Sequence, residues 1–324
     1  MESPPTAPAT TGSTSVLTSA RSGKAGHTLI TLVLLAVGLL AATQAMPSFL
    51  AQLVQWGAIP RYTRRQRSLR PPRPLGERDR AGLSGTDLYR GAHAGTVPVT
   101  LYKGVFDAIP DRIVGYVSDD EVIRYHRVVS EPSGQRYLHD LASTIDTMTD
   151  DPDDRARIAV SVVQHLDYDT ARAAGTYYGV RCPYETLHLG RGVCSDKSVL
   201  LAALLRDLGF GVALLRFDAE CHMAVGIRCP DGYDYLGTGY AFAEGTTPSI
   251  ITDADGDYVG AGRLVSAPKV IPIAEGQAFA SIANEDRDAA EWNELRGTGP
   301  VLDAYHYERW QALSREYDIL PETG

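Results

Sequence analysis

Residues 190–210 read "GRGVCSDKSVLLAALLRDLGF", and this stretch decides the fold. Its second half is a run of helix-forming residues that ends at Gly209, a typical residue just beyond a helix C-terminus. The apolar face that predicts a buried helix consists of Leu201, Leu204, Leu205 and Leu208. Cys194 lies in the first turn, where free N–H groups and the positive end of the helix dipole stabilise a thiolate. We therefore expect a reactive cysteine at the start of a buried helix.

Candidate partners for this thiol follow in the sequence. His222 opens the strand-like stretch "HMAVGIRC" (222–229), and the carboxylates of Asp234 and Glu244 come after it. An isolated cysteine is more often buried and inert. A thiol, a histidine that takes its proton and a carboxylate that orients the histidine, however, form the set that nucleophilic catalysis needs.

Two carboxylates compete for the orienting position. If the turn "CPDG" (229–232) joins two paired strands, Asp234 lies too far along the hairpin from His222, and residues 239–240 lie opposite the histidine. Glu244 reaches His222 only if a glycine between the strands adds a bulge or a turn. We expect Glu244 to orient His222 and keep Asp234 as the alternative.

The blocks "CPYETLHLGRGVCSDKSVLLAALLRDLGF" (182–210), "CHMAVGI" (221–227) and "YAFAEGTTP" (240–248) resemble the transglutaminase-like superfamily of papain-like thiol enzymes. The resemblance covers roughly residues 135–265. It implies an α+β fold in which the cysteine helix packs on an antiparallel sheet. It also implies that Cys194 is the nucleophile, that His222 is the general base and acid, and that a carboxylate orients the histidine.

Two residues qualify the resemblance. Membrane-associated relatives often have Glu-Thr-Thr in the third block, whereas this chain has Gly245 between Glu244 and the two threonines.

Gln164 is a possible oxyanion donor, because a glutamine has this role in papain-like enzymes. The simpler interpretation of Gln164 is a helix residue that faces solvent.

Local patterns predict the other elements. Strands are expected at 96–106, 121–130, 211–217, 222–229, 234–245 and 256–265. Helices are expected at 136–148 and from Pro152 onward, where Asp151 is the predicted N-cap. Residues 168–192 are expected to form a long loop, and residues 283–318 a polar helix.

The N-terminal third predicts a membrane anchor. Residues 1–27 are rich in Ser, Thr, Pro and Ala and are expected to be disordered. The uncharged stretch "TLITLVLLAVGLLAATQAM" (28–46) is long enough to span a bilayer, and we expect a transmembrane helix at 28–50. A cleaved signal peptide is the alternative, but the stretch before it is unusually long. A basic Pro/Arg-rich linker (51–85), a catalytic domain with a strand and helix extension (86–282) and a helical tail (283–324) would follow.

The side of the membrane is ambiguous. Six arginines within residues 61–73 place the catalytic domain in the cytoplasm by the positive-inside rule. The resemblance points outward, because anchored relatives commonly face that way. We expect the outward orientation, in which Cys182 and Cys229 could form a disulfide.

Charge and cysteine content exclude other classes. Residues 74–324 carry a net charge of −16, so nucleic-acid binding is not expected. The chain has four cysteines and no C-x-x-C pair, so we expect neither a zinc site nor any other cofactor. The sequence thus predicts a membrane-anchored enzyme that acts on amide bonds of a protein or peptide, by hydrolysis or by acyl transfer to an amine. A non-catalytic binding scaffold on the same fold is the alternative.

Overall fold

The computed structural model describes residues 78–87, 93–109, 120–175, 179–298 and 301–319, and side chains from residue 95 onward. All of them belong to one compact unit, residues 48–324. The expected disordered segment (1–27), transmembrane helix (28–50) and most of the linker (51–85) lie outside the described residues. Within the described ranges, no helix is both long enough and apolar enough to cross a membrane.

The centre of the fold is a four-stranded antiparallel sheet with the strand order β7-β6-β5-β8. The strands are β5 (Val212–Phe217), β6 (His222–Arg228), β7 (Tyr240–Ala243) and β8 (Lys269–Ala274). Nearly every residue of β5 and β6 is buried, because helices and loops cover both faces of these strands. A sheet covered in this way forms a rigid support for residues at the strand ends.

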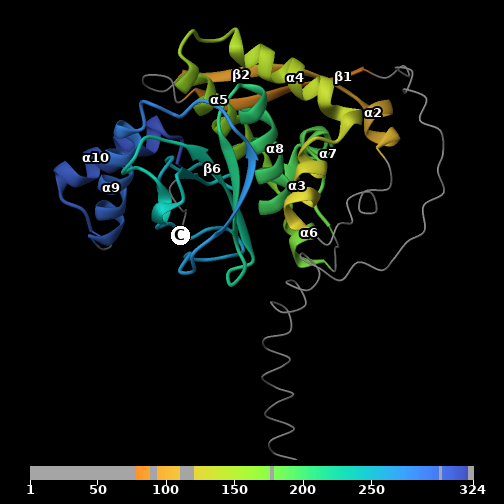
Figure 1. Ribbon diagram of the computed structural model, residues 1–324. Coiled ribbons are helices and arrows are strands. Elements are labelled where there is room, and N and C mark those ends of the chain that lie inside the picture. Colours follow the sequence, from red (N-terminus) through yellow and green to blue (C-terminus); the bar gives the residue numbers. More distant parts are fainter. Residues whose placement is uncertain (1–77, 88–92, 110–119, 176–178, 299–300, 320–324) are drawn as a thin grey trace, which may run out of the picture. The chain divides into compact units, whose positions relative to one another are not determined.

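The cysteine helix α8 (Cys194–Asp207) packs on β5 and β6. Figure 1 shows it between the sheet and the helices α3 (Glu121–Val129) and α7 (Pro183–Leu189). The expectation of an α+β fold with this helix on an antiparallel sheet is confirmed. As predicted, α8 ends before Gly209, which has a positive φ of 88°.

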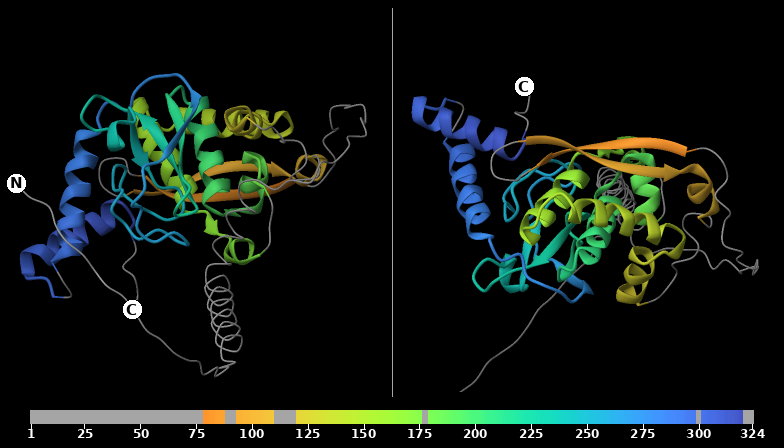
Figure 2. Two further views of the ribbon diagram at one scale, coloured as in Figure 1. Left: turned by 60° about the horizontal axis from the view of Figure 1, so that its bottom comes forward. Right: turned by 90° about the horizontal axis from the view of Figure 1, so that it is seen from above.

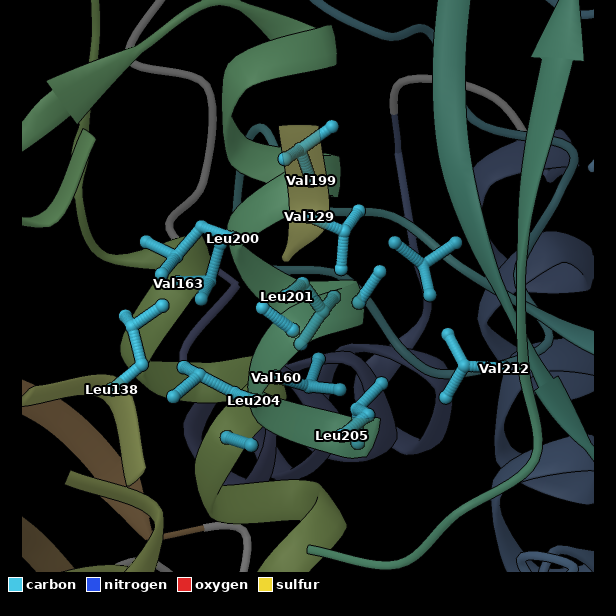
Figure 3. Packing of buried hydrophobic residues seen from close by; sticks show 14 of the residues in the cluster. Val129, Leu138, Val160, Val163, Val199, Leu200, Leu201, Leu204, Leu205 and Val212 are labelled. Atoms are coloured by element: carbon cyan, nitrogen blue, oxygen red, sulfur yellow. The ribbon is translucent and has the colours of Figure 1, made fainter. Parts of the chain in front are cut away.

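Helices α4 (Pro132–Asp146) and α5 (Pro152–Gln164) cover the other side of α8. The Asp151 side chain accepts a hydrogen bond from Asp153 N, and Pro152 opens α5, as the sequence predicts. Leucines of α8 interdigitate with valines of α5 and with Leu138 of α4 (Figure 3). These leucines are fully buried, so α8 is fixed along its whole length.

A hairpin of β1 (Arg78–Asp87) and β2 (His93–Tyr102) precedes the helices. It is orange in Figure 2 and lies along α4 and α5. The expected strand at 96–106 therefore holds only to Tyr102, because helix α2 (Lys103–Ala108) begins at the next residue.

The expected strand at 121–130 is wrong, because this segment is helix α3. The Asp120 side chain caps it by accepting a hydrogen bond from Ile123 N, and its buried residues, Tyr125, Val128 and Val129, follow helical spacing. The cap and the helical spacing outweigh the strand preference of the β-branched residues.

The expected loop at 168–192 is also wrong in large part. Strand β3 (Asp167–Tyr168) pairs in parallel with β4 (Arg191–Gly192), and α6 (Thr170–Ala174) and α7 lie between them. The expected strand at 256–265 consists of turns with one bridge between Tyr258 and Gly262.

The C-terminal region forms two helices, α9 (Ala283–Gly297) and α10 (Ala304–Glu316), which contact each other and are blue in Figure 2. They share a second apolar cluster with Ile250 of the loop after β7. Arg157 of α5 forms an ion pair of 2.5 Å with Glu285 of α9. The apolar cluster thus joins α9 to the loop after β7, and the ion pair joins α9 to α5.

Candidate active site

Cys194 is the first residue of α8 and is only 4% exposed. The preceding backbone is held by Asp196, whose carboxylate accepts hydrogen bonds from Val193 N and Arg181 N and pairs with Arg172. Gly192 permits this close packing, because a Cβ there would lie 2.8 Å from the Asp196 Cβ. Asp196 thus stabilises the N-terminus of the helix, where Cys194 lies.

His222 is the first residue of β6 and is fully buried. Its Nε2 atom lies 2.8 Å from Oε2 of Glu244. Burial lowers the pKa of His222, but the charge of Glu244, the nearby Cys194 and the hydrogen bond with Glu244 outweigh burial and raise it to about 10. Glu244 thus holds Nε2 of the imidazole, whereas Nδ1 is buried and has no hydrogen-bond partner among the described residues. The charged form of the ring is favoured at neutral pH.

Glu244 follows β7 and is also fully buried. Its Oε1 atom accepts hydrogen bonds from Gly245 N (3.0 Å), Thr246 N (2.7 Å) and Thr246 Oγ1 (2.6 Å). Burial raises the pKa of Glu244, but His222 and these donors outweigh burial and lower it below its usual value. The inserted Gly245 does not displace the carboxylate and instead supplies one of its donors.

The strand register explains why Glu244, and not Asp234, lies beside His222. Residues Val225 and Ala243 are paired, as are Arg228 and Tyr240, so residues 229–239 form a long connection. The expectation that residues 239–240 face the histidine is therefore wrong. Within this connection Asp234 Oδ2 accepts a hydrogen bond from Gly239 N at 3.1 Å. This bond keeps the Asp234 side chain in the connection.

Tyr258 covers the histidine ring. The two rings are stacked, with centroids 5.6 Å apart and an interplanar angle of 16°. The Tyr258 hydroxyl donates to Asp253 O at 2.7 Å, and the Asp253 carboxylate accepts a hydrogen bond from Arg296 of α9. No local signal in the sequence marks Tyr258, because its stack on His222 depends on the path of the loop.

Gln164 has neither of the two expected roles. Its side chain is buried (3% exposed), so the solvent-facing interpretation is wrong. Its Nε2 atom donates to the backbone oxygens of Glu244 and Ser249, both at 3.0 Å. An amide nitrogen has two N–H groups, and both are used here, so Gln164 is not placed as an oxyanion donor.

Lys197 is a second buried polar residue at the site, three positions after Cys194. Its Nζ atom donates to the backbone oxygens of Gln164, Leu166 and Thr246. Through these contacts Lys197 connects α8 to the loop of Glu244.

Cys182 and Cys229 are not joined in the structure, which contradicts the expected disulfide between them. Cys182 is buried at the start of α7, which packs on α8 and α4, whereas Cys229 follows the sheet strand β6. Within the described parts of the chain, no group of three or more His, Cys, Asp or Glu side chains is arranged to hold a metal ion.

Comparison with known proteins agrees with this geometry. Residues 139–214 match the model of the transglutaminase-like superfamily, a range that includes α5 and α8. No curated protein matches the chain. The match supports the resemblance to this superfamily; it includes Cys194 and α8 and ends before His222 and Glu244.

Proposed function

We propose that the protein is a cysteine enzyme that acts on peptide or isopeptide amide bonds through a thioester at Cys194. The observation that carries the proposal is the buried His222–Glu244 pair at 2.8 Å, which lies near Cys194, the first residue of α8. A carboxylate that fixes the ring and stabilises its charged form is the arrangement that activates a nucleophile.

In the proposed reaction the Cys194 thiolate attacks the carbonyl carbon of an amide. A C–S bond forms, the C–N bond breaks, and the His222 imidazolium gives its proton to the departing amine. In hydrolysis, water then attacks the thioester carbonyl while His222 takes a proton from the water; the C–S bond breaks, the carboxylic acid leaves, and the Cys194 thiolate and the His222 imidazolium are restored. Glu244 keeps the ring oriented in both steps, and neither step requires a metal or an organic cofactor.

Hydrolysis is the first proposal and transfer of the acyl group to an amine the second. Water reaches the thioester by itself, whereas transfer requires a second substrate bound beside Cys194. The thiol is only 4% exposed, so the carbonyl has to reach it through a narrow opening or after neighbouring residues move. A protein or peptide segment in an extended conformation suits such a site.

A non-catalytic binding scaffold on the same fold is the rival proposal. Such a scaffold has no use for a buried imidazole paired with a carboxylate near a cysteine at a helix N-terminus. The buried His222–Glu244 pair near Cys194 therefore favours the enzyme.

We test the function by trapping the thioester. The full-length protein is mixed with a library of glutamine-containing and isopeptide-linked peptides, quenched in acid and analysed by intact-protein mass spectrometry. The proposal predicts an acyl adduct on Cys194 that hydroxylamine removes and that the Cys194→Ala variant lacks. Failure to form an adduct, together with failure to react with cysteine-directed activity probes, would favour the scaffold.

We further propose that residues 28–50 anchor the protein in a membrane with the catalytic domain on the outer side. The proposal rests on the uncharged sequence of residues 28–46 and on the resemblance to anchored enzymes. The positive-inside rule favours the opposite side, so the topology needs its own experiment.

A further inference from the structure

Two buried side chains that the proposed chemistry does not use form hydrogen bonds to the backbone of the loop that carries Glu244. One is Gln164, the last residue of α5, and the other is Lys197 in the first turns of α8. Both contact the backbone of residues 244–249 and not the Glu244 carboxylate.

The contacts of Lys197 join three parts of the site. An ammonium group has three N–H donors, and here each has its own backbone oxygen: Gln164 O at 3.1 Å, Leu166 O at 2.7 Å and Thr246 O at 2.7 Å. Gln164 is the last residue of α5, and Leu166 lies two residues beyond it. Thr246 is the residue that donates two hydrogen bonds to Glu244. Since Lys197 is on the Cys194 helix, its ammonium ties that helix to the Glu244 loop.

Gln164 holds the same loop at two further points. Its amide donates to the oxygen of Glu244 itself and to that of Ser249, five residues later. Together the two side chains bind the backbone at residues 244, 246 and 249. Side chains of α5 and α8 therefore hold the backbone of the loop that carries the Glu244 carboxylate.

Burying a lysine is costly, and this cost argues for a specific role. The Lys197 side chain is completely buried, and burial lowers its pKa to about 7. An apolar residue of similar length would avoid this cost but would leave three backbone oxygens without their donor. The buried lysine thus lowers the stability of the fold, but it fixes the distance between α8 and residues 244–249.

We propose that Lys197 and Gln164 are positioning residues, which hold residues 244–249 against the cysteine helix so that Glu244 keeps its hydrogen bond to His222. The inference rests on the proposed function, because it presumes that Glu244 orients the histidine. Neither residue touches the reacting atoms, and both act through Glu244.

The test is the pH profile of Cys194 alkylation by iodoacetamide in the full-length protein, followed by peptide mass spectrometry. This readout needs no substrate and reports how far the imidazolium supports the thiolate. Removing the negative charge in Glu244→Gln is expected to slow alkylation at pH ~6 by about tenfold or more. Lys197→Met is expected to slow it about three- to tenfold, in the same direction, because Glu244 then leaves its optimal position.

A double-mutant cycle separates positioning from general loss of stability. If Lys197 acts through Glu244, Lys197→Met has almost no further effect in the Glu244→Gln background. Gln164→Met removes no charge and is expected to behave in the same way, which provides the test even if Lys197→Met does not fold. Arg157→Met is the matched control: it removes another buried cation, paired with Asp154 and Glu285, and should leave the profile unchanged.

The outcomes are distinct. Wild-type profiles for folded Lys197→Met and Gln164→Met, while Glu244→Gln is impaired, would overturn the positioning role and leave the proposed function intact. Equal effects with and without Glu244 would overturn it as well. An unchanged profile in Glu244→Gln would instead contradict the proposed function.

Discussion

His222 and Glu244 are joined by a hydrogen bond of 2.8 Å between two side chains that are completely buried. Twenty-two residues separate them, and the sheet brings them together because β6 begins with the histidine while the glutamate directly follows β7. The charge of each partner favours the charged form of the other. Their position beside Cys194 is the basis for the predictions that follow.

The first prediction concerns the identity of the orienting acid. Glu244→Gln is expected to fold and to lose roughly 10²–10⁴-fold in the rate of acyl-enzyme formation, by analogy with other triads that lose this residue. Asp234→Asn is the matched control and should keep near-full activity, because Asp234 contacts Gly239 in the turn. The reverse pattern would assign the role to Asp234.

The second prediction concerns stability and pH. The pKa of His222 is raised in the folded protein, so its contribution to stability is complete below its unfolded value of about 6.5 and is lost as the pH rises through about 10. The pKa of Glu244 is lowered, so its contribution is present above its usual value of 4.5 and is lost as the pH falls further. Urea unfolding of the wild type and of His222→Gln should therefore give free energies that converge between pH ~7 and ~10. A constant difference would show that the pair is not charged in the folded state.

The third prediction concerns Tyr258. Tyr258→Leu removes the ring stacked on His222, and such a stack contributes about 0.5–1.5 kcal/mol. The pKa of His222, followed by NMR, is expected to fall in this variant. Tyr258→Phe keeps the ring and loses the two hydrogen bonds of the hydroxyl, which donates to Asp253 O and accepts from Gly256 N, so its His222 should titrate close to the wild type. If both variants titrate like the wild type, the stack does not act on the imidazolium.

The fourth prediction concerns the core around the cysteine helix. Leu204→Ala creates a cavity in a fully buried site between α8 and α5, with an expected loss of about 2–5 kcal/mol in the free energy of unfolding. The exposed Val301 is a suitable control, and Val301→Ala should change it by less than about 0.5 kcal/mol. A small loss for Leu204→Ala would mean that α8 is not packed as described.

The fifth prediction concerns the proposed anchor. Deletion of residues 1–57 is expected to move the protein from the membrane fraction to the soluble fraction of lysed cells. Protease treatment of intact cells should digest residues 86–324 if the domain faces outward. Full protection of that segment would show that the arginines at 61–73 determine the topology.

Local signals in the sequence predict those elements whose formation depends on neighbouring residues. The cysteine helix, its end before Gly209 and the cap at Asp151 were predictable, because each depends on neighbouring residues. Helix α3 was harder to predict, because its β-branched residues favour a strand. Its one local helix signal is the cap residue Asp120.

The site was predictable in its residue types but not in its geometry. The resemblance of residues 240–248 to the family block favours Glu244 over Asp234. The expected hairpin register is wrong, because the connection at 229–239 is long. The roles of Lys197, Gln164 and Tyr258 depend on tertiary contacts between segments far apart in the chain. No pattern within a short window reports such contacts.

The most direct measurement of the central claim is the rate of Cys194 alkylation relative to the other thiols. Burial raises the pKa of Cys182, and burial raises that of Cys229 to about 11, so both should react slowly. At pH ~6, iodoacetamide is expected to label Cys194 ahead of Cys182, Cys221 and Cys229, and His222→Ala should abolish this advantage. Equal labelling of the four cysteines in the folded protein, or an advantage that survives His222→Ala, would contradict the account.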